Sequence, residues 1–145
     1  MKDIVLDTMI AKNLCNPVAP IYKDFIKWLS EDGILCYSQF LLNEYNRGTS
    51  SSPSPTNILA LIDRQLRRGI NAKVSTEAMK QFTFSKKQIR VMQTHKKDYP
   101  IMKTVLLSNR KYFVSGEATI VADLNSFPGH NCLAACQIGH IPYRN

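Results

Sequence analysis

The stretch Ile4-Val5-Leu6-Asp7 decides how the rest of the sequence is interpreted. Three consecutive apolar residues followed by an acid are typical of a short strand that is buried on both faces. Strands of this kind belong to parallel sheets, whose functional sites form where the strands end. Asp7, the residue at that end, is therefore the first candidate for a site residue.

Two later apolar runs, at residues 34–37 and 112–115, predict two more buried strands. Apolar spacing, capping residues and breaks predict helices over 18–30, from Ser38, over 58–66, from Ser75, over 85–109 with a break near Pro100, and over 118–126. A final edge strand is expected at 137–141. Strands that alternate with helices predict an α/β sandwich with a parallel sheet.

Length and composition indicate one soluble globular domain. The chain has 145 residues, of which 44% are hydrophobic and 21% charged. No apolar run approaches the ~20 residues of a membrane helix, and the segment Met1-Lys2-Asp3 has no features of a signal peptide. We therefore expect a cytoplasmic protein that does not associate with membranes.

The net charge of +8 indicates attraction to polyanions such as nucleic acids. The cations are clustered along the chain, at Arg64, Arg67 and Arg68, at Lys80, Lys86, Lys87 and Arg90, and at Lys96, Lys97 and Lys103. Solvated helix faces are the alternative explanation of these clusters, and charge alone does not decide between the two.

Three further acids occupy positions comparable to that of Asp7. Glu44 lies about two turns into the helix after the second strand, Asp98 opens a late helix, and Glu117 follows the third strand by two residues. In a parallel sheet the strand-end acids share one edge, and the helix acids can lean over it. Each acid also has a structural explanation: Asp98 as a helix cap, Glu44 as a solvated side chain, Glu117 as part of a surface loop.

A cluster of these four carboxylates would need a counterion, because like charges repel one another. A hard divalent cation such as Mg²⁺ or Mn²⁺ offsets that repulsion with oxygen ligands and retained waters. Such a cation lowers the pKa of a bound water and neutralises charge on a phosphodiester under attack. Together with the basic surface, the acids point to phosphodiester hydrolysis.

The four segments that carry the acids resemble the PIN-domain family, and the resemblance spans nearly the whole chain. The matching segments are Val5-Leu6-Asp7-Thr8, Leu41-Leu42-Asn43-Glu44, Asp98-Tyr99-Pro100-Ile101 and Tyr112-Phe113-Val114-Ser115-Gly116-Glu117. Each motif is short and degenerate, so the specificity lies in their order and spacing.

The resemblance implies a three-layer α/β/α sandwich over residues 1–145 and a Mg²⁺- or Mn²⁺-dependent ribonuclease. Asp7, Glu44 and Asp98 would be metal ligands, Glu117 would complete the metal site, and the Thr8 hydroxyl would orient Asp7 or a metal-bound water. Small members of the family are often toxins held inactive by a cognate antitoxin, and they commonly form homodimers. RNA, an antitoxin and a second copy of the chain are therefore the expected partners.

The sequence departs from the family pattern in three places. Met9 stands where the family often has Asn or a small residue, Glu117 is a methylene longer than the usual Asp, and the C-terminal region carries Cys132 and Cys136. These departures leave open a weakened enzyme, or a non-catalytic RNA-binding or interaction module on the same fold.

The C-terminal region raises two further alternatives. With His130 and His140, the cysteine pair Cys132 and Cys136 could hold zinc, although reduced thiols are the simpler explanation. Tyr143 and Arg144 could reach a dimer partner or RNA. A nucleotide-binding α/β domain is a last alternative, but the chain has neither a GxGxxG motif nor a phosphate-binding loop.

Overall fold

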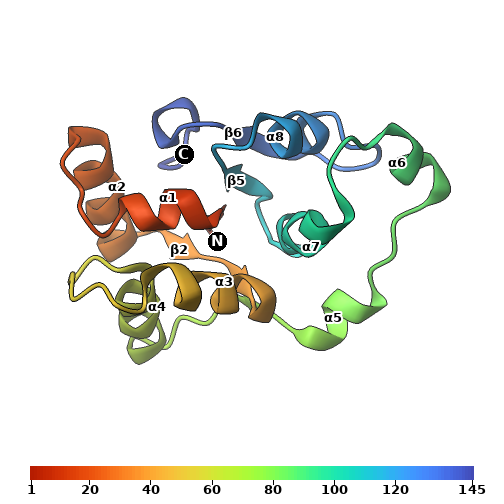
Figure 1. Cartoon of the computed structure of the whole chain (residues 1–145). Helices are drawn as coiled ribbons and strands as arrows, with labels where there is room; N and C mark the ends of the chain where they lie inside the picture. Colours follow the sequence, from red (N-terminus) through yellow and green to blue (C-terminus); the bar gives the residue numbers. More distant parts are fainter.

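A four-stranded, entirely parallel sheet forms the centre of the fold (Figure 1). The computed structural model describes all of residues 1–145. The strand order is β2 (Ile34–Leu35), β1 (Asp3–Leu6), β5 (Tyr112–Val114) and β6 (Leu133–Ala135). The first apolar run of the sequence is thus an internal strand with four buried residues, as its composition predicts.

The second apolar run divides between two sheets instead of forming one strand. Ile34 and Leu35 pair with β1, whereas β3 (Tyr37–Ser38) pairs in parallel with β4 (Lys73–Val74) in a separate two-stranded sheet. Cys36 lies at the junction, where its N–H donates to the carbonyl of Ile4 at 2.9 Å. Ser38 then caps the next helix by accepting from the N–H of Leu41, as the sequence predicts.

Helices flank the sheet. They are α1 (Thr8–Asn13), α2 (Pro20–Glu31), α3 (Gln39–Thr49), α4 (Ile58–Arg67), α5 (Thr76–Gln81), α6 (Lys86–Val91), α7 (Tyr99–Leu107) and α8 (Ala118–Asn125), with 3₁₀ turns at Lys96–Asp98 (η1) and Ile138–His140 (η2). None of the helices has the length and apolar character needed to cross a lipid bilayer. The fold class expected from the sequence, α/β with a central parallel sheet, is confirmed.

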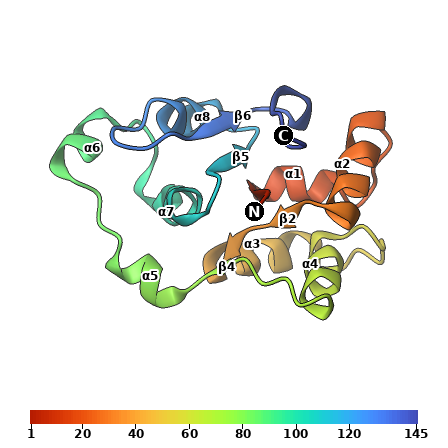
Figure 2. The ribbon, with the colours of Figure 1, turned by 180° about the vertical axis from the view of Figure 1, so that it is seen from behind.

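Two details of the sequence prediction are wrong. The edge strand lies at Leu133–Ala135, where it pairs with β5, and not at 137–141, where a 3₁₀ turn stands. The side-chain amide of Asn125 on α8 bonds the outer N–H and carbonyl of Ala134. The long helix expected over 85–109 stops at Val91 and resumes only at residue 96. Figures 1 and 2 both show the resulting excursion, with α5 and α6 at the periphery beyond α7.

The C-terminal tail packs against its own chain, which leaves Tyr143 buried and unable to reach a partner or RNA as it stands. Arg144 is exposed, so its contact with a partner or RNA stays a prediction. Tyr143 is buried against Phe25 and Trp28, with ring centroids 5.1 and 5.0 Å away. Its hydroxyl donates to Asp24, and Arg144 Nη2 lies 2.7 Å from Asp24 Oδ1. The bond from Arg144 lowers the pKa of Asp24 to about 2, and burial raises the pKa of Tyr143 to about 12.

Gln65 ties three elements together beside the central sheet. Its side chain on α4 is buried, and its Oε1 accepts from the N–H of Leu35 at 3.0 Å. Its Nε2 donates to the carbonyl of Gly33 at 3.0 Å and to that of Leu29 at 3.4 Å. One side-chain amide therefore provides hydrogen-bond partners for backbone groups at the end of α2 and the start of β2. These groups lie next to β1, the strand that leads to Asp7.

Replacing this amide should destabilise the whole domain. We expect Gln65→Leu to lower the free energy of unfolding by roughly 2–4 kcal/mol, since it leaves buried backbone groups without partners. Chemical denaturation measures the loss. Gln81→Leu, at an exposed position, is the matched control and should change stability little. Equal stability of the two variants would contradict this role for Gln65.

Candidate functional site

Asp7 lies where β1 ends and α1 begins, and both of its carboxylate oxygens accept hydrogen bonds. Oδ1 accepts from the N–H of Thr8 at 2.8 Å, which caps α1. Oδ2 accepts from the hydroxyl of Ser115 at 2.6 Å. The N–H of Asp7 donates to the carbonyl of Val114 at 3.0 Å, so the pairing of β1 with β5 continues to this residue. Asp7 is thus held in place by the first residue of α1 and by the end of β5.

Ser115 joins Asp7 to Glu117, and sequence reasoning did not select it as a site residue. Ser115 follows β5 directly and is fully buried. Its Oγ donates to Asp7 and also accepts from the N–H of Glu117 at 3.0 Å. The signal that could have found it was present, because a small hydroxyl residue stands directly between a buried strand and an acid.

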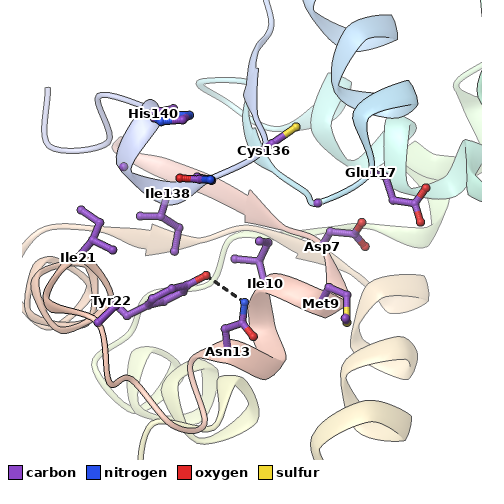
Figure 3. Close-up of a pocket in the computed structure, with 14 residues that line it drawn as sticks. Asp7, Met9, Ile10, Asn13, Ile21, Tyr22, Glu117, Cys136, Ile138 and His140 are labelled. Carbon is purple, nitrogen blue, oxygen red and sulfur yellow. Dashed lines mark hydrogen bonds between the residues drawn. The ribbon is translucent and has the colours of Figure 1, made fainter.

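A pocket of about 920 Å³ opens beside this junction (Figure 3). Figure 3 shows the carboxylates of Asp7 and Glu117 at one end of the pocket. The structure therefore brings the two strand-end acids to the same edge of the sheet, as parallel strands require. Met9, the departure from the family pattern, is exposed next to Asp7 and also lines the pocket.

Asp98 lies in a neighbouring pocket that Glu117 also borders. That pocket has a volume of about 270 Å³, and His95 and Lys97 contribute to its lining. Asp98 is the N-cap residue of α7, but its side chain makes no capping hydrogen bond. Helix capping therefore does not explain why an acid stands at position 98. Glu117 lines both the pocket of Asp7 and the pocket of Asp98, so it connects the two.

Glu44 is not brought together with the other acids. Tyr45, the next residue, donates its hydroxyl to the carbonyl of Leu6 and so holds α3 at the end of β1. Burial raises the pKa of this tyrosine well above its usual value. The Glu44 carboxylate, however, pairs with Arg47 on the same helix and lines neither pocket.

Thr8 contacts Asp7 through its backbone. Its N–H donates to the Asp7 carboxylate, whereas its side-chain methyl group lies beside α3. A Cβ atom at Gly48 would lie 3.2 Å from that methyl and 2.8 Å from Lys12 Cε. A side chain at this position would therefore require Lys12 to move and the Thr8 methyl to shift slightly.

The donors available here fit an open magnesium or manganese site rather than a closed cage. No three His, Cys, Asp or Glu side chains are grouped so that they could hold a metal ion together. Mg²⁺ commonly uses only one or two carboxylates and keeps several waters, and Asp7 and Glu117 provide two hard oxygen ligands at one pocket end. These two residues therefore suit the cation.

The zinc alternative does not fit the structure, because its four candidate ligands are dispersed. His130 packs against Phe82 and Phe127, and desolvation lowers its pKa. Burial raises the pKa of the Cys132 thiol to about 11, which disfavours the thiolate that zinc needs. All four cysteines are free.

Asp123 on α8 fixes the segment that leads to Asp98. Its buried Oδ2 accepts from the N–H of Gln93 at 2.9 Å, from the N–H of Thr94 at 2.7 Å, and from the Thr94 hydroxyl. These bonds to the backbone take the place of helical ones, which explains why the predicted long helix breaks here. They also bring residues 93–98 to the start of α8, beside Glu117.

Comparisons with known proteins support the fold. No protein-family model matches the sequence, and no curated protein matches it. A chain in the crystal structure of VapBC2 from Rickettsia felis bound to a DNA fragment from its promoter is structurally similar, with a TM-score of 0.54. The likeness covers 92% of this chain and 97% of that one at 16% identity. At this identity it shows the fold alone, which is consistent with a PIN-like arrangement.

Removing the Asp123 carboxylate should loosen the segment that holds Asp98. In Asp123→Ala we expect faster hydrogen exchange at the amides of Gln93 and Thr94 and a loss of roughly 2–3 kcal/mol in stability, because buried donors lose their acceptor. NMR-detected exchange measures the first effect. Asp63→Ala, which removes an exposed carboxylate, is the control. Unchanged exchange at both amides would rule out the anchoring role.

Proposed function

We propose that this chain is a metal-dependent ribonuclease that hydrolyses phosphodiester bonds of RNA with Mg²⁺ or Mn²⁺. The observation that carries the proposal is the hydrogen-bonded series Asp7, Ser115 and Glu117, which presents two carboxylates at one end of an open pocket. The resemblance of four sequence segments to the PIN-domain family supports the same conclusion.

In this proposal the acids have different roles. Asp7 and Glu117 hold the cation, and Asp98 acts from the adjoining pocket. Glu44 would contribute a ligand to the cation only if its salt bridge with Arg47 broke. Ser115 is a positioning residue, because its hydroxyl bonds both the Asp7 carboxylate and the backbone of Glu117. When bound, the cation supplies an activated water and neutralises charge on the phosphodiester.

A basic segment that leads into the site supports RNA as the substrate. Residues 80–97 contain Lys80, Lys86, Lys87, Arg90, Lys96 and Lys97 and no acidic residue. All six cations are exposed and form no salt bridge. The segment runs from the end of α5 through the peripheral helix α6 (Figure 2), and its last residue precedes Asp98 in the sequence. Unpaired cations of this kind attract a phosphate backbone by releasing its counterions.

We further propose that the ribonuclease is the toxin of a toxin–antitoxin pair and that it forms a homodimer. The family resemblance supports both statements. The structural likeness to a chain of VapBC2, a two-component complex, supports the first. An antitoxin would then be the regulatory partner of the chain.

Replacing Asp7 tests the proposed reaction. Purified Asp7→Asn protein should cleave a mixed RNA pool at least ~100-fold more slowly, which corresponds to losing about 3 kcal/mol of transition-state stabilisation. The wild-type protein should cut with Mg²⁺ or Mn²⁺ and stop in EDTA. RNA affinity of the variant should stay equal or rise, because a negative charge near the phosphate is removed.

The control and the remaining outcomes separate this enzyme from its alternative. Asp63→Asn, an exposed acid paired with Arg67, should cleave as the wild type does. Cleavage that survives in Asp7→Asn or in EDTA would refute the metal site. RNA binding without cleavage by folded wild-type protein would identify a non-catalytic RNA-binding module on the same fold.

A further inference from the structure

The pocket beside Asp7 has two chemically different ends. Opposite the carboxylates lies an apolar half made of Ile10, Ile21, Tyr22 and Ile138 (Figure 3). Ile10 and Ile138 are buried and form its floor, whereas Ile21 is 38% exposed and Tyr22 is half-buried at its wall. A metal site alone does not need these side chains.

We propose that this apolar half binds the base of one nucleotide of a single-stranded RNA whose phosphate lies at Asp7 and Glu117. The inference rests on the proposed function and names a binding subsite within it. Bases of single-stranded RNA are recognised by stacking on aromatic side chains, and such stacking tolerates any base. The aromatic wall and the carboxylates border one continuous pocket of about 920 Å³.

A hydrogen bond to its hydroxyl holds the Tyr22 ring in position for stacking on a base. Asn13 Nδ2 donates to the Tyr22 hydroxyl at 3.0 Å, which links the aromatic wall to α1. The amide of Asn13 keeps its second N–H and its carbonyl oxygen free of hydrogen bonds. A free donor and acceptor on one planar amide are the groups that pair with the edge of a base.

The charges around the pocket favour binding of an RNA base, and not of the phosphate backbone, in the apolar half. No lysine or arginine lines the pocket, so the only basic side chain that a phosphate could meet in the apolar half is the imidazole of His140. The backbone is instead accommodated by the basic segment 80–97 and by a cation at the two carboxylates. Aromatic ring, amide and carboxylate pair thus correspond to the base face, the base edge and the phosphate of one nucleotide.

A double-mutant cycle tests the contact without any cleavage. The affinity of the full chain for short oligouridines is measured with Ca²⁺, a cation that also takes oxygen ligands, in place of Mg²⁺ or Mn²⁺. One uridine at a time is replaced by an abasic nucleotide. At one position, loss of the base should weaken binding to the wild type by about 5- to 10-fold. With Tyr22→Leu the same abasic change should have no further effect.

Three further variants control for misfolding and for a non-specific loss of RNA affinity. Tyr22→Phe keeps the ring and should retain the sensitivity to the abasic nucleotide. Ile21→Asp places a carboxylate in the apolar half without altering a buried residue and should abolish that sensitivity, whereas Ile21→Ala should largely preserve it.

The outcomes distinguish this inference from the proposed function. Equal abasic losses in wild type and Tyr22→Leu, with cleavage intact, would overturn the base subsite alone. If the abasic substitution and Tyr22→Leu are coupled but the wild-type protein cleaves no RNA, the base subsite would be supported and the proposed ribonuclease activity overturned. Failure of folded wild-type protein to bind any RNA would overturn both.

Discussion

The parallel pairing of β1 with β5 is the contact on which the site depends. Leu6 is in register with Val114, and the bond from the N–H of Asp7 to the Val114 carbonyl extends the pairing by one residue. Because both strands end at the same level, Asp7 and Ser115 meet, and Ser115 Oγ reaches the Asp7 carboxylate at 2.6 Å. The other elements of the site are arranged around this junction.

The electrostatics follow from that geometry. Two carboxylates at one end of a pocket repel each other, and the hydrogen bonds to Asp7 compensate only part of its charge. In the proposed function a divalent cation would supply the remainder, and the exposed cations of residues 80–97 would attract a polyanion at a distance. The acidic and basic groups are separated in space, because the basic segment lies at the periphery of the fold and the residue after it is Asp98.

The parts of the fold that depend on local sequence were predictable, and the parts that depend on distant contacts were not. Strand β1, the cap at Ser38 and the strand-end acids Asp7 and Glu117 follow from short patterns of apolar and polar residues. Helix α1 was not predicted, because six residues after Asp7 are too few to show helical periodicity.

The errors have long-range causes. The break after Val91 depends on Asp123, which lies about thirty residues away and accepts the backbone donors that a helix would have used. Strand β6 depends on pairing with β5, about twenty residues earlier, and the amide of Asn125 bonds its outer edge. Glu44 is the exception, because its partner is local: its half-buried carboxylate pairs with the exposed Arg47, one helical turn along the same helix.

The most direct test of the central claim, that the acids at this sheet edge hold one divalent cation, is a crystal structure with Mn²⁺ at saturating concentration. The account predicts an anomalous scattering peak in contact with the carboxylates of Asp7 and Glu117, on the side of the pocket that faces Asp98. A peak elsewhere, such as at Cys132 and His130, or well-ordered carboxylates with no peak between them, would contradict it.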